Sequence, residues 1–438
     1  MEKPNDLDRR LGRTEHIYWL LDQLYCLNFL VFAEIEGTLN SDDLQAALDV
    51  VQRENPVLRV KIVVDRAGQP CFEPVSAKDR PLRPEVHGLR NWRQFVEAQL
   101  ITPFAKAEAP LCRFLWFRGR GNKSVVAMAF HHSIADGKSG ASILFDVLRR
   151  ATLRDWQPHF KAARPSSQQL DLIREKRVVA GKLKELKFWL GTGMEVLKFP
   201  KQLPGYDMDP RDARKIKTIP FVLSSKTNAA LSAVCRDKGT TIHGALGAAL
   251  LFSINREFDD VESRYLGLNS LADLRSVLKG NLTEQDLGIY ISTLTTVHRL
   301  DEESDFWSLA REIPSRLKEV MNSGDANLIN SIYTEIPLFT PDKSGARKVQ
   351  KIVALAPPSS MLTNIGRINE LALGGALRIC SLAFAVSPPA QHPLCVTADS
   401  YGGQMYLNVL YDQCKLKDQQ ARRIAKNMKS ELSQAADG

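Results

Sequence analysis

Hydrophobic and polar residues in the first 150 positions alternate between a helical and an extended period. Leu44, Ala47, Leu48 and Val51 recur at the spacing of one helix face, which predicts a helix over 41–53 that residues 41–43 cap. Further helices are predicted over 14–24, with Thr14 as the N-cap, over 92–100, and over 139–150, which Ser139 opens. Short runs of branched and aromatic residues predict strands over 29–36, 58–64, 71–75, 111–117 and 124–130.

The second half resumes this rhythm after a polar stretch at 158–169, which contains Pro165-Ser166-Ser167 and is the best linker in the chain. Helices are predicted over 224–238, 241–256, 306–321 and 416–432, and the second of these is so apolar that we expect it to be buried. Strands are predicted over 218–223, 265–271, 289–300, 377–386, 394–399 and 404–411. The shared rhythm, without a clear internal repeat, predicts two α/β lobes. A cleft between lobes is a favoured place for a ligand site.

Length and composition fit this picture. A chain of 438 residues exceeds what one hydrophobic core usually supports, and 44% hydrophobic with 25% charged residues is a globular composition. The seven cysteines are scattered and never spaced as Cys-x-x-Cys, which indicates neither a disulfide framework nor a zinc site. The amino terminus has no apolar signal core, and polar residues interrupt the apolar stretch at 17–35, so we expect a cytoplasmic protein without a membrane span.

The net charge of +9 is concentrated in one segment. Between Arg149 and Lys187 eleven basic residues face four acidic ones, an excess of seven positive charges. This segment is either a solvated helix face or a docking surface, for an acidic partner such as an acyl carrier protein or for a phosphate-bearing ligand. No nucleic-acid motif or row of stacking aromatic residues accompanies the charge, so we expect no nucleic-acid partner.

The most informative local chemistry lies at 131–137, His-His-Ser-Ile-Ala-Asp-Gly, between a predicted strand and a predicted helix. A neutral histidine ring can accept a proton from a hydroxyl, an amine or a thiol. Gly137 permits a backbone turn that a side chain would obstruct, and Asp136 either contacts His132 or points away toward an arginine. His131 and His132 point to opposite sides of an extended chain and no third ligand is spaced for a metal, so we expect no metal site.

The whole string HHSIADGKSG resembles the His-His-x-x-x-Asp-Gly signature of the condensation-domain superfamily. That superfamily includes chloramphenicol acetyltransferase and stand-alone polyketide-associated acyltransferases of the phthiocerol dimycocerosyl transferase type, which this chain resembles most in kind. Further similar stretches are Leu44–Arg59, with Asn55 where His is common, Thr241–Leu251, Ala272–Arg275 and Thr363–Arg367.

The resemblance implies an α/β (α+β) fold of two chloramphenicol-acetyltransferase-like lobes of mixed sheet and helices, with an active-site tunnel between them. The lobes would be residues 1–170 and 171–438, and a segment of the second would cross over to the first. It implies that His132 is the general base and that His131 is structural. Asp136 would support the site by pairing with Arg275, Gly137 would keep the tunnel passable, and Asn364 would lie near it.

The implied activity is transfer of an acyl group from acyl-CoA or a phosphopantetheinyl carrier protein to a hydroxyl acceptor, forming an ester in secondary or lipid metabolism. No tightly bound cofactor is implied. The Asp-Phe-Gly-Trp-Gly motif of the plant and yeast-type enzymes is absent, which argues against that branch. Alternatives are a free-standing condensation enzyme that acts on an amine, a non-catalytic scaffold for carrier proteins, and a basic binder of nucleic acid or membrane surfaces.

Overall fold

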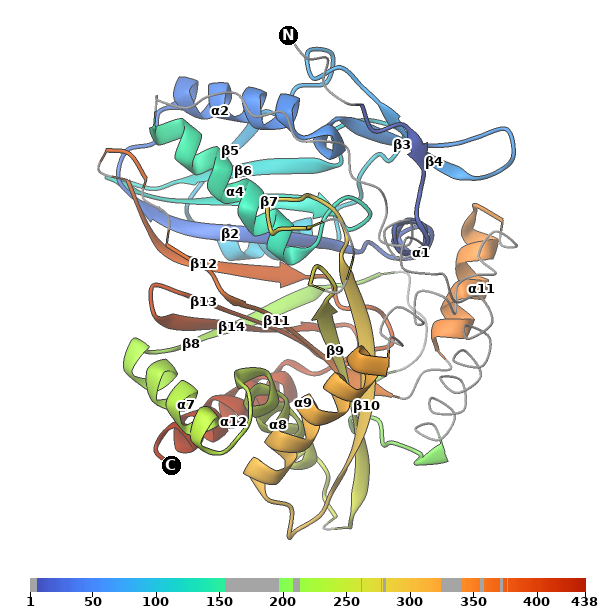
Figure 1. The fold of residues 1–438 in the computed structure, drawn as a ribbon, viewed down its shortest axis with the longest axis vertical. Coiled ribbons are helices and arrows are strands. Elements are labelled where there is room, and N and C mark those ends of the chain that lie inside the picture. Colours follow the sequence, from blue (N-terminus) through green and yellow to red (C-terminus); the bar gives the residue numbers. More distant parts are fainter. Residues whose placement is uncertain are drawn as a thin grey trace.

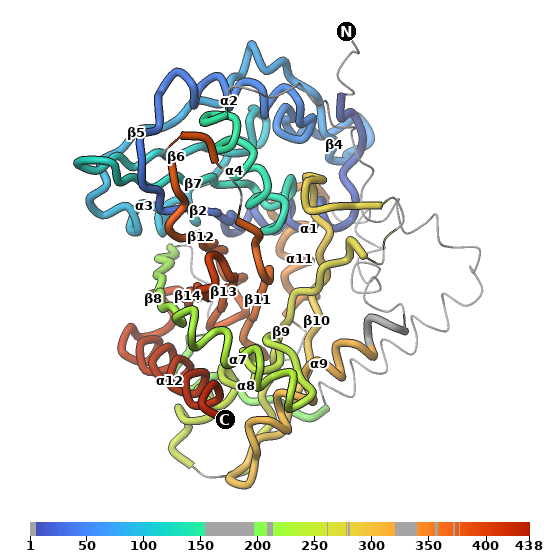
Figure 2. The backbone as a smooth tube through the Cα atoms, turned by 60° about the vertical axis from the view of Figure 1, so that its left-hand side comes forward, coloured from blue at the N-terminus to red at the C-terminus, as the bar shows by residue number. Residues whose placement is uncertain are grey.

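A computed structural model describes residues 6–153, 197–207, 213–260, 262–276, 278, 281–323, 340–354, 358–370, 373–375 and 377–438. Figure 1 and Figure 2 show these residues arranged as two α/β layers, one above the other, with strands of both lobes meeting in the middle. The α-helices in the described ranges are α1 (Arg13–Leu21), α2 (Ser41–Glu54), α3 (Trp92–Gln99), α4 (Gly137–Thr152), α7 (Ser225–Asp237), α8 (Ile242–Asn255), α9 (Phe306–Ser323), α11 (Lys343–Val353) and α12 (Asp418–Ala436).

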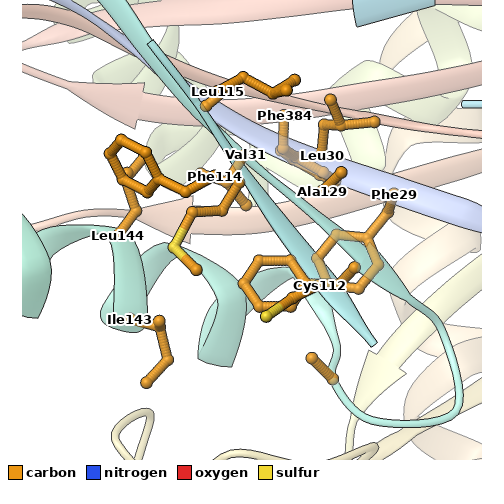
Figure 3. Packing of buried hydrophobic residues seen from close by; sticks show 14 of the residues in the cluster. Phe29, Leu30, Val31, Cys112, Phe114, Leu115, Ala129, Ile143, Leu144 and Phe384 are labelled. Carbon is orange, nitrogen blue, oxygen red and sulfur yellow. The ribbon is translucent and has the colours of Figure 1, made fainter. Parts of the chain in front are cut away.

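The upper lobe is built on a five-stranded sheet in the order β12-β2-β7-β6-β5. Its strands are β2 (Asn28–Glu36), β5 (Pro84–Gly88), β6 (Cys112–Arg118), β7 (Lys123–His131) and β12 (Arg378–Val386). β7 is buried along nearly its whole length, and its side chains pack with those of β2, β6 and α4 in one hydrophobic core (Figure 3). A short 3₁₀ helix (Pro56–Arg59) leads into a small sheet of β1 (Arg9–Arg10), β3 (Val60–Val64) and β4 (Pro70–Pro74).

The lower lobe is built on a six-stranded mixed sheet in the order β10-β9-β11-β13-β14-β8. Its strands are β8 (Ile216–Leu223), β9 (Arg264–Asp273), β10 (Ile291–Leu300), β11 (Ser359–Arg367), β13 (Cys395–Tyr401) and β14 (Gln404–Asp412). Helices α7, α8, α9 and α12 cover one face of this sheet (Figure 1), and the core between them is separate from that of the upper lobe. The prediction of a mixed α/β fold with two lobes is confirmed.

β12 comes from the C-terminal part of the chain but completes the sheet of the N-terminal part. It pairs antiparallel with β2, from Arg378 opposite Glu36 to Val386 opposite Phe29. Two side chains of the lower sheet, Thr397 and Asn408, donate hydrogen bonds to the Phe384 carbonyl of β12, at 2.7 and 3.0 Å. β12 therefore joins the two sheets.

The expected lobe boundary near residue 170 and most of the basic segment at 149–187 lie outside the described residues.

Several predicted helix starts are wrong. α4 begins at Gly137 instead of Ser139, because Asp136 is its N-cap and accepts a hydrogen bond from the Ser139 amide. α2 is capped by Asn40, whose side chain accepts hydrogen bonds from the backbone amides of Asp42 and Asp43. α1 begins after Gly12, which is its N-cap. The strands β1, β5 and β11 and the helix α11 were not predicted. Within the described ranges, no helix is both long enough and apolar enough to span a bilayer.

Candidate active site

The ring of His132 is fixed on three sides where β7 ends and the loop to α4 begins. It stacks on Tyr18 of α1, with ring centroids 4.3 Å apart, and lies against Phe29 of β2 at 4.9 Å. Its Nδ1 is 3.0 Å from the carbonyl oxygen of Ala135. A carbonyl can only accept, so Nδ1 carries the proton and donates it, which leaves Nε2 with a lone pair in the neutral ring. No hydrogen bond from Nε2 is present among the described residues.

Burial sets the charge state of this ring. Only 6% of the His132 surface is exposed, and burial lowers its pKa to about 4, although the Asp136 carboxylate and the Ala135 carbonyl act in the opposite direction. The imidazole is therefore neutral at pH 7, with a fixed tautomer and an unprotonated Nε2. A histidine in this state can act as a general base.

His131 points to the other side of the strand, as predicted. Its Nδ1 accepts a hydrogen bond from the Ser133 amide at 3.1 Å, and its Nε2 lies 3.4 Å from Asp22 Oδ2. Asp22 also pairs with Lys106 at 2.6 Å. Burial opposes the ionisation of Asp22, but His131 and Lys106 outweigh it and hold the pKa of this carboxyl below its usual value. His131 thus takes part in a buried charge network away from the His132 ring.

Asp136 is fully buried and holds the loop to the other lobe. Its carboxylate accepts hydrogen bonds from the Ser139 amide, from the Tyr290 amide at 3.0 Å and from Arg275, whose Nη2 lies 2.9 Å from Oδ2. The Asp136 amide in turn donates to the Gly288 carbonyl at 3.0 Å. Of the two orientations that the sequence left open, Asp136 adopts the one toward an arginine, and the predicted pair with Arg275 is confirmed.

Arg275 lies just beyond the end of β9 and is 6% exposed. Besides Asp136, its guanidinium contacts Asp273 at 3.1 Å and lies 4.9 Å from the centre of the Tyr290 ring. Burial disfavours its charge, but the two carboxylates more than compensate and raise the pKa of Arg275 above its usual value. The residue therefore stays cationic and neutralises the buried Asp136.

Gly137 lies in a closely packed position and not in a left-handed backbone turn. It is absent from the residues with a positive φ, so the expectation of a special turn is wrong. A methyl group at this position would lie 3.2 Å from Ile365 of β11 and 3.6 Å from Phe384 of β12. Asn364 precedes that Ile365, but its side chain accepts a hydrogen bond from the Gly366 amide at 2.9 Å and so serves its own strand.

Four contacts of the site were not found from the sequence. These are the stacking of Tyr18 on His132, the tilted contact of Phe29 with His132, the hydrogen bond from Ser133 Oγ to the Glu15 carbonyl at 3.0 Å, and the interaction of Tyr290 with Arg275. The first three bring together residues more than 100 positions apart along the chain. An aromatic residue on a short helix, such as Tyr18, has no local signal that separates it from ordinary core. No group of three or more metal-ligating side chains lies together in the ranges that the structure describes.

Comparison with known proteins places this geometry in a wider context. A family model described as the Condensation domain matches residues 20–438. No curated protein sequence matches the chain significantly. The polyketide synthase associated protein 5 from Mycobacterium tuberculosis is similar in structure, with a TM-score of 0.71 at 15% identity over 99% of both chains.

Two further solved structures share the fold. The TRI3 trichothecene 15-O-acetyltransferase from Fusarium sporotrichioides has a TM-score of 0.75 at 11% identity, over 98% of this chain and 95% of that one. The first condensation domain of the CDA synthetase has a TM-score of 0.70 at 14% identity, over 98% of this chain and 96% of that one. Identities this low show a common fold, and they do not identify the substrate of this protein.

Proposed function

The chain belongs to the condensation-domain family, and from that premise we propose that it transfers an acyl group from a thioester to a hydroxyl acceptor, with His132 as the general base. The observation that carries the proposal is the state of one ring. His132 is neutral at pH 7, its Nδ1 proton is donated to the Ala135 carbonyl, and its Nε2 keeps a lone pair.

In the proposed reaction His132 Nε2 removes the proton of the acceptor hydroxyl while the oxygen attacks the thioester carbonyl. A carbon–oxygen bond forms, the carbonyl carbon becomes tetrahedral, and its oxygen becomes an oxyanion. The oxyanion collapses, the carbon–sulfur bond breaks, and the imidazolium returns its proton to the leaving thiolate. The products are an ester and a free thiol, without a covalent enzyme intermediate.

The surroundings of His132 support this cycle. While the ring is an imidazolium, the Ala135 carbonyl and the Asp136 carboxylate both favour its charge. Asp136 is itself bound to Arg275, Ser139 and Tyr290, so it acts on His132 at a distance and positions the loop. The oxyanion requires a hydrogen-bond donor, for which the amide of Gly137 at the N-terminus of α4 is our proposal.

We propose an alcohol over an amine as acceptor. The name of the Fusarium neighbour describes transfer to oxygen, and free-standing members of the resembled group esterify alcohols. The donor would be acyl-CoA or an acyl group on the phosphopantetheine arm of a carrier protein, and no tightly bound cofactor is proposed. An amide-forming enzyme would use the same base and differ in the acceptor.

The test is acyl transfer by the full chain. We expect mass spectrometry to detect an ester when the protein is given a panel of acyl-CoAs or acylated carrier proteins and a mixture of alcohols and amines. General base catalysis contributes about 10²–10⁴-fold, so His132→Ala should lower kcat by at least about 10²-fold. Circular dichroism and thermal unfolding would show that the variant is folded.

The matched control is His243→Asn. His243 is also a histidine whose pKa burial lowers to about 4, but it lies in helix α8 and hydrogen-bonds Ser270 of β9, outside the site. Its loss should leave kcat within about threefold of the wild type. A folded His132→Ala protein with near-normal transfer would refute the role of His132, and product found only with amines would establish the amide-forming alternative.

A further inference from the structure

Asp399 of β13 is a buried carboxyl group that the proposed reaction does not use. It is 1% exposed, and neither of its oxygens has a hydrogen-bond partner in the described part of the chain. Tyr406 stands opposite Asp399 on the neighbouring strand β14, but its hydroxyl contacts Gln404 at 2.7 Å and the Cys380 carbonyl at 3.2 Å. Burial raises the pKa of Asp399 well above its usual value. A buried polar group without a partner destabilises the fold.

The direction of Asp399 follows from its neighbours along the strand. Side chains two residues apart in a strand point to the same face. Thr397 donates its hydrogen bond to the Phe384 carbonyl of β12, and Tyr401 stacks on Phe145 of α4 with ring centroids 6.1 Å apart. Asp399 lies between these two residues, so its carboxyl group faces the upper lobe, toward β12 and α4, and not the helices of the lower lobe.

The opposite wall is the face of α4 that begins at the catalytic loop. Gly137 and Phe145 are two helical turns apart, and Ala141 lies between them on the same face. Gly137 lies beside Phe384, whose carbonyl Thr397 binds, and Phe145 lies on Tyr401. Four residues of a helix rise about 6 Å and two residues of a strand about 6.6 Å. Successive residues in the α4 row (137, 141, 145) and in the β13 row (397, 399, 401) are therefore spaced by similar distances. Asp399 therefore lies in the row between Thr397 and Tyr401, on the side of the stretch of α4 between Gly137 and Phe145.

This juxtaposition places Asp399 in the same interlobe seam as His132. Gly137, the first residue of α4, is five residues beyond His132, and Ala141 is one turn further on. β11 lies beside β13 here, with Gly366 opposite Asp399, and the Ile365 of β11 is the residue that a side chain at position 137 would contact. The carboxyl group thus lies on the side of the seam lined by α4, away from the contacts that fix the His132 ring.

We propose that Asp399 is a specificity-determining residue, whose carboxyl group hydrogen-bonds a non-reacting hydroxyl group on a substrate chain that lies between the lobes. This inference rests on the proposed transferase function. A neutral carboxyl group offers one O–H donor and accepting oxygens, and a hydroxyl group both accepts and donates, so the two are complementary. The hydroxyl belongs either to the acyl chain or to a diol acceptor, and the experiment distinguishes these two sources.

The experiment compares matched substrates. One pair is an acyl-CoA with and without a hydroxyl group on its chain, and the other is a primary alcohol and the corresponding diol. We expect the wild type to prefer the hydroxylated member of one pair in kcat/KM by at least about tenfold, because a site built to hydrogen-bond a hydroxyl rejects the analogue that lacks it. The pair that shows the preference identifies the source.

Asp399→Leu should abolish that preference, so that the variant uses the two members of the pair with kcat/KM values within about threefold of each other. The same variant should unfold at a higher temperature than the wild type, since an apolar side chain of similar volume removes an unpaired buried carboxyl group. Asp399→Asn keeps polar atoms and should retain part of the preference, which also covers the case that the leucine variant does not fold. The control is Ser270→Ala, a buried polar residue on the other face of the same sheet, which should not change selectivity.

Two results would overturn the inference. One is a wild type with no preference in either pair, and the other is an Asp399→Leu protein that keeps the wild-type preference. Failure of the proposed function is a separate result, namely no acyl transfer by the wild type with any donor. The role of Asp399 would then be tested by the ligand-induced shift in unfolding temperature. The diol or the hydroxyacyl-CoA should stabilise the wild type more than Asp399→Leu, and equal stabilisation would reject the role of Asp399.

Discussion

At the scale of the residue, the burial of His132 predicts an unusual pH dependence. Its pKa of about 4 lies well below the ordinary histidine value of about 6.5. The base acts in its neutral form, so activity rises with pH through the pKa and is then constant. We expect kcat/KM to stay within about twofold from pH 7.5 down to pH 5.

An ordinary histidine would instead lose about thirtyfold in its neutral form by pH 5. Initial rates of thiol release, measured at substrate concentrations well below KM, would follow the free enzyme. An acidic limb with a midpoint between pH 6 and 7 would contradict the burial of this ring in the active protein.

Residue types at the site could be predicted from the sequence because they lie in one short motif. His132, Asp136 and Gly137 lie within six positions of one another and so can be recognised as one motif. The expected ion pair between Asp136 and Arg275 is present. The reason for Gly137 could not be predicted, because Ile365 and Phe384 approach it from strands more than 200 positions away. Asp399 gave no signal either, since an aspartate near a Gly-Gly hairpin resembles any exposed turn residue.

At the scale of the element, Asp136 and Arg275 hold the start of α4 to the end of β9, and their removal should destabilise the protein. Removing one partner of a buried ion pair leaves an unpaired charge and costs about 3–5 kcal/mol. We therefore expect Asp136→Ala and Arg275→Met each to lower the free energy of unfolding by an amount in this range, measured by urea denaturation.

The double variant Asp136→Ala/Arg275→Met should be less destabilised than the sum of the two single variants, because neither charge is then left alone. Transfer activity should fall with the loop geometry. A single Asp136→Ala variant with wild-type stability and abolished activity would show instead that Asp136 acts directly on the substrate.

Most elements with a clear period were predicted to within a few residues, the amphipathic helix α11 being an exception, and strands without such a period were missed. β11, with the sequence Ser-Ser-Met-Leu-Thr-Asn-Ile-Gly-Arg, is an inner strand between β9 and β13 and shows no alternation of polar and apolar positions. β5 is short, exposed and begins at a proline. The start of α4 was misplaced because Asp136 serves both as a helix cap and as an ion-pair partner, and only the second role was expected.

At the scale of the whole molecule, buried histidines in both lobes should make stability fall in mild acid. Burial lowers the pKa of His16, His132, His243 and His392 to about 4. The unfolded chain has ordinary values near 6.5, so between about pH 4 and 6.5 the unfolded state binds more protons and stability falls as pH falls. Asp399 acts oppositely, because its raised pKa makes the folded state hold an extra proton.

We expect unfolding to take up about three protons net near pH 5, four by the histidines less one from Asp399. Urea denaturation at pH 5, 6 and 7 would give this number from the slope of the unfolding free energy. A flat profile over this range would be inconsistent with neutral, buried imidazoles. Replacing His243 with asparagine should reduce the slope by about one proton.

Two lobes, and a segment crossing from the second to the first, were expected from the sequence and its family resemblance, but the strand that crosses and the strand it pairs with could not be identified. A regular succession of strands and helices indicates how many layers a chain forms, whereas strand pairing across the molecule depends on complementary surfaces that no local pattern shows. The pairing of β12 with β2 is the clearest case, since the ion pair of Arg378 with Glu36 joins positions 342 residues apart.

This pairing has a consequence for biogenesis. While the protein is being made, the upper sheet leaves the ribosome with the edge of β2 uncovered, and its last strand is synthesised only after most of the chain. At about 5–20 residues per second the delay is roughly 20 to 70 s. During that time the open edge offers unpaired backbone groups to any neighbouring chain. The order of strands in this protein therefore makes its folding during translation dependent on chaperones that cover the β2 edge until β12 has been synthesised.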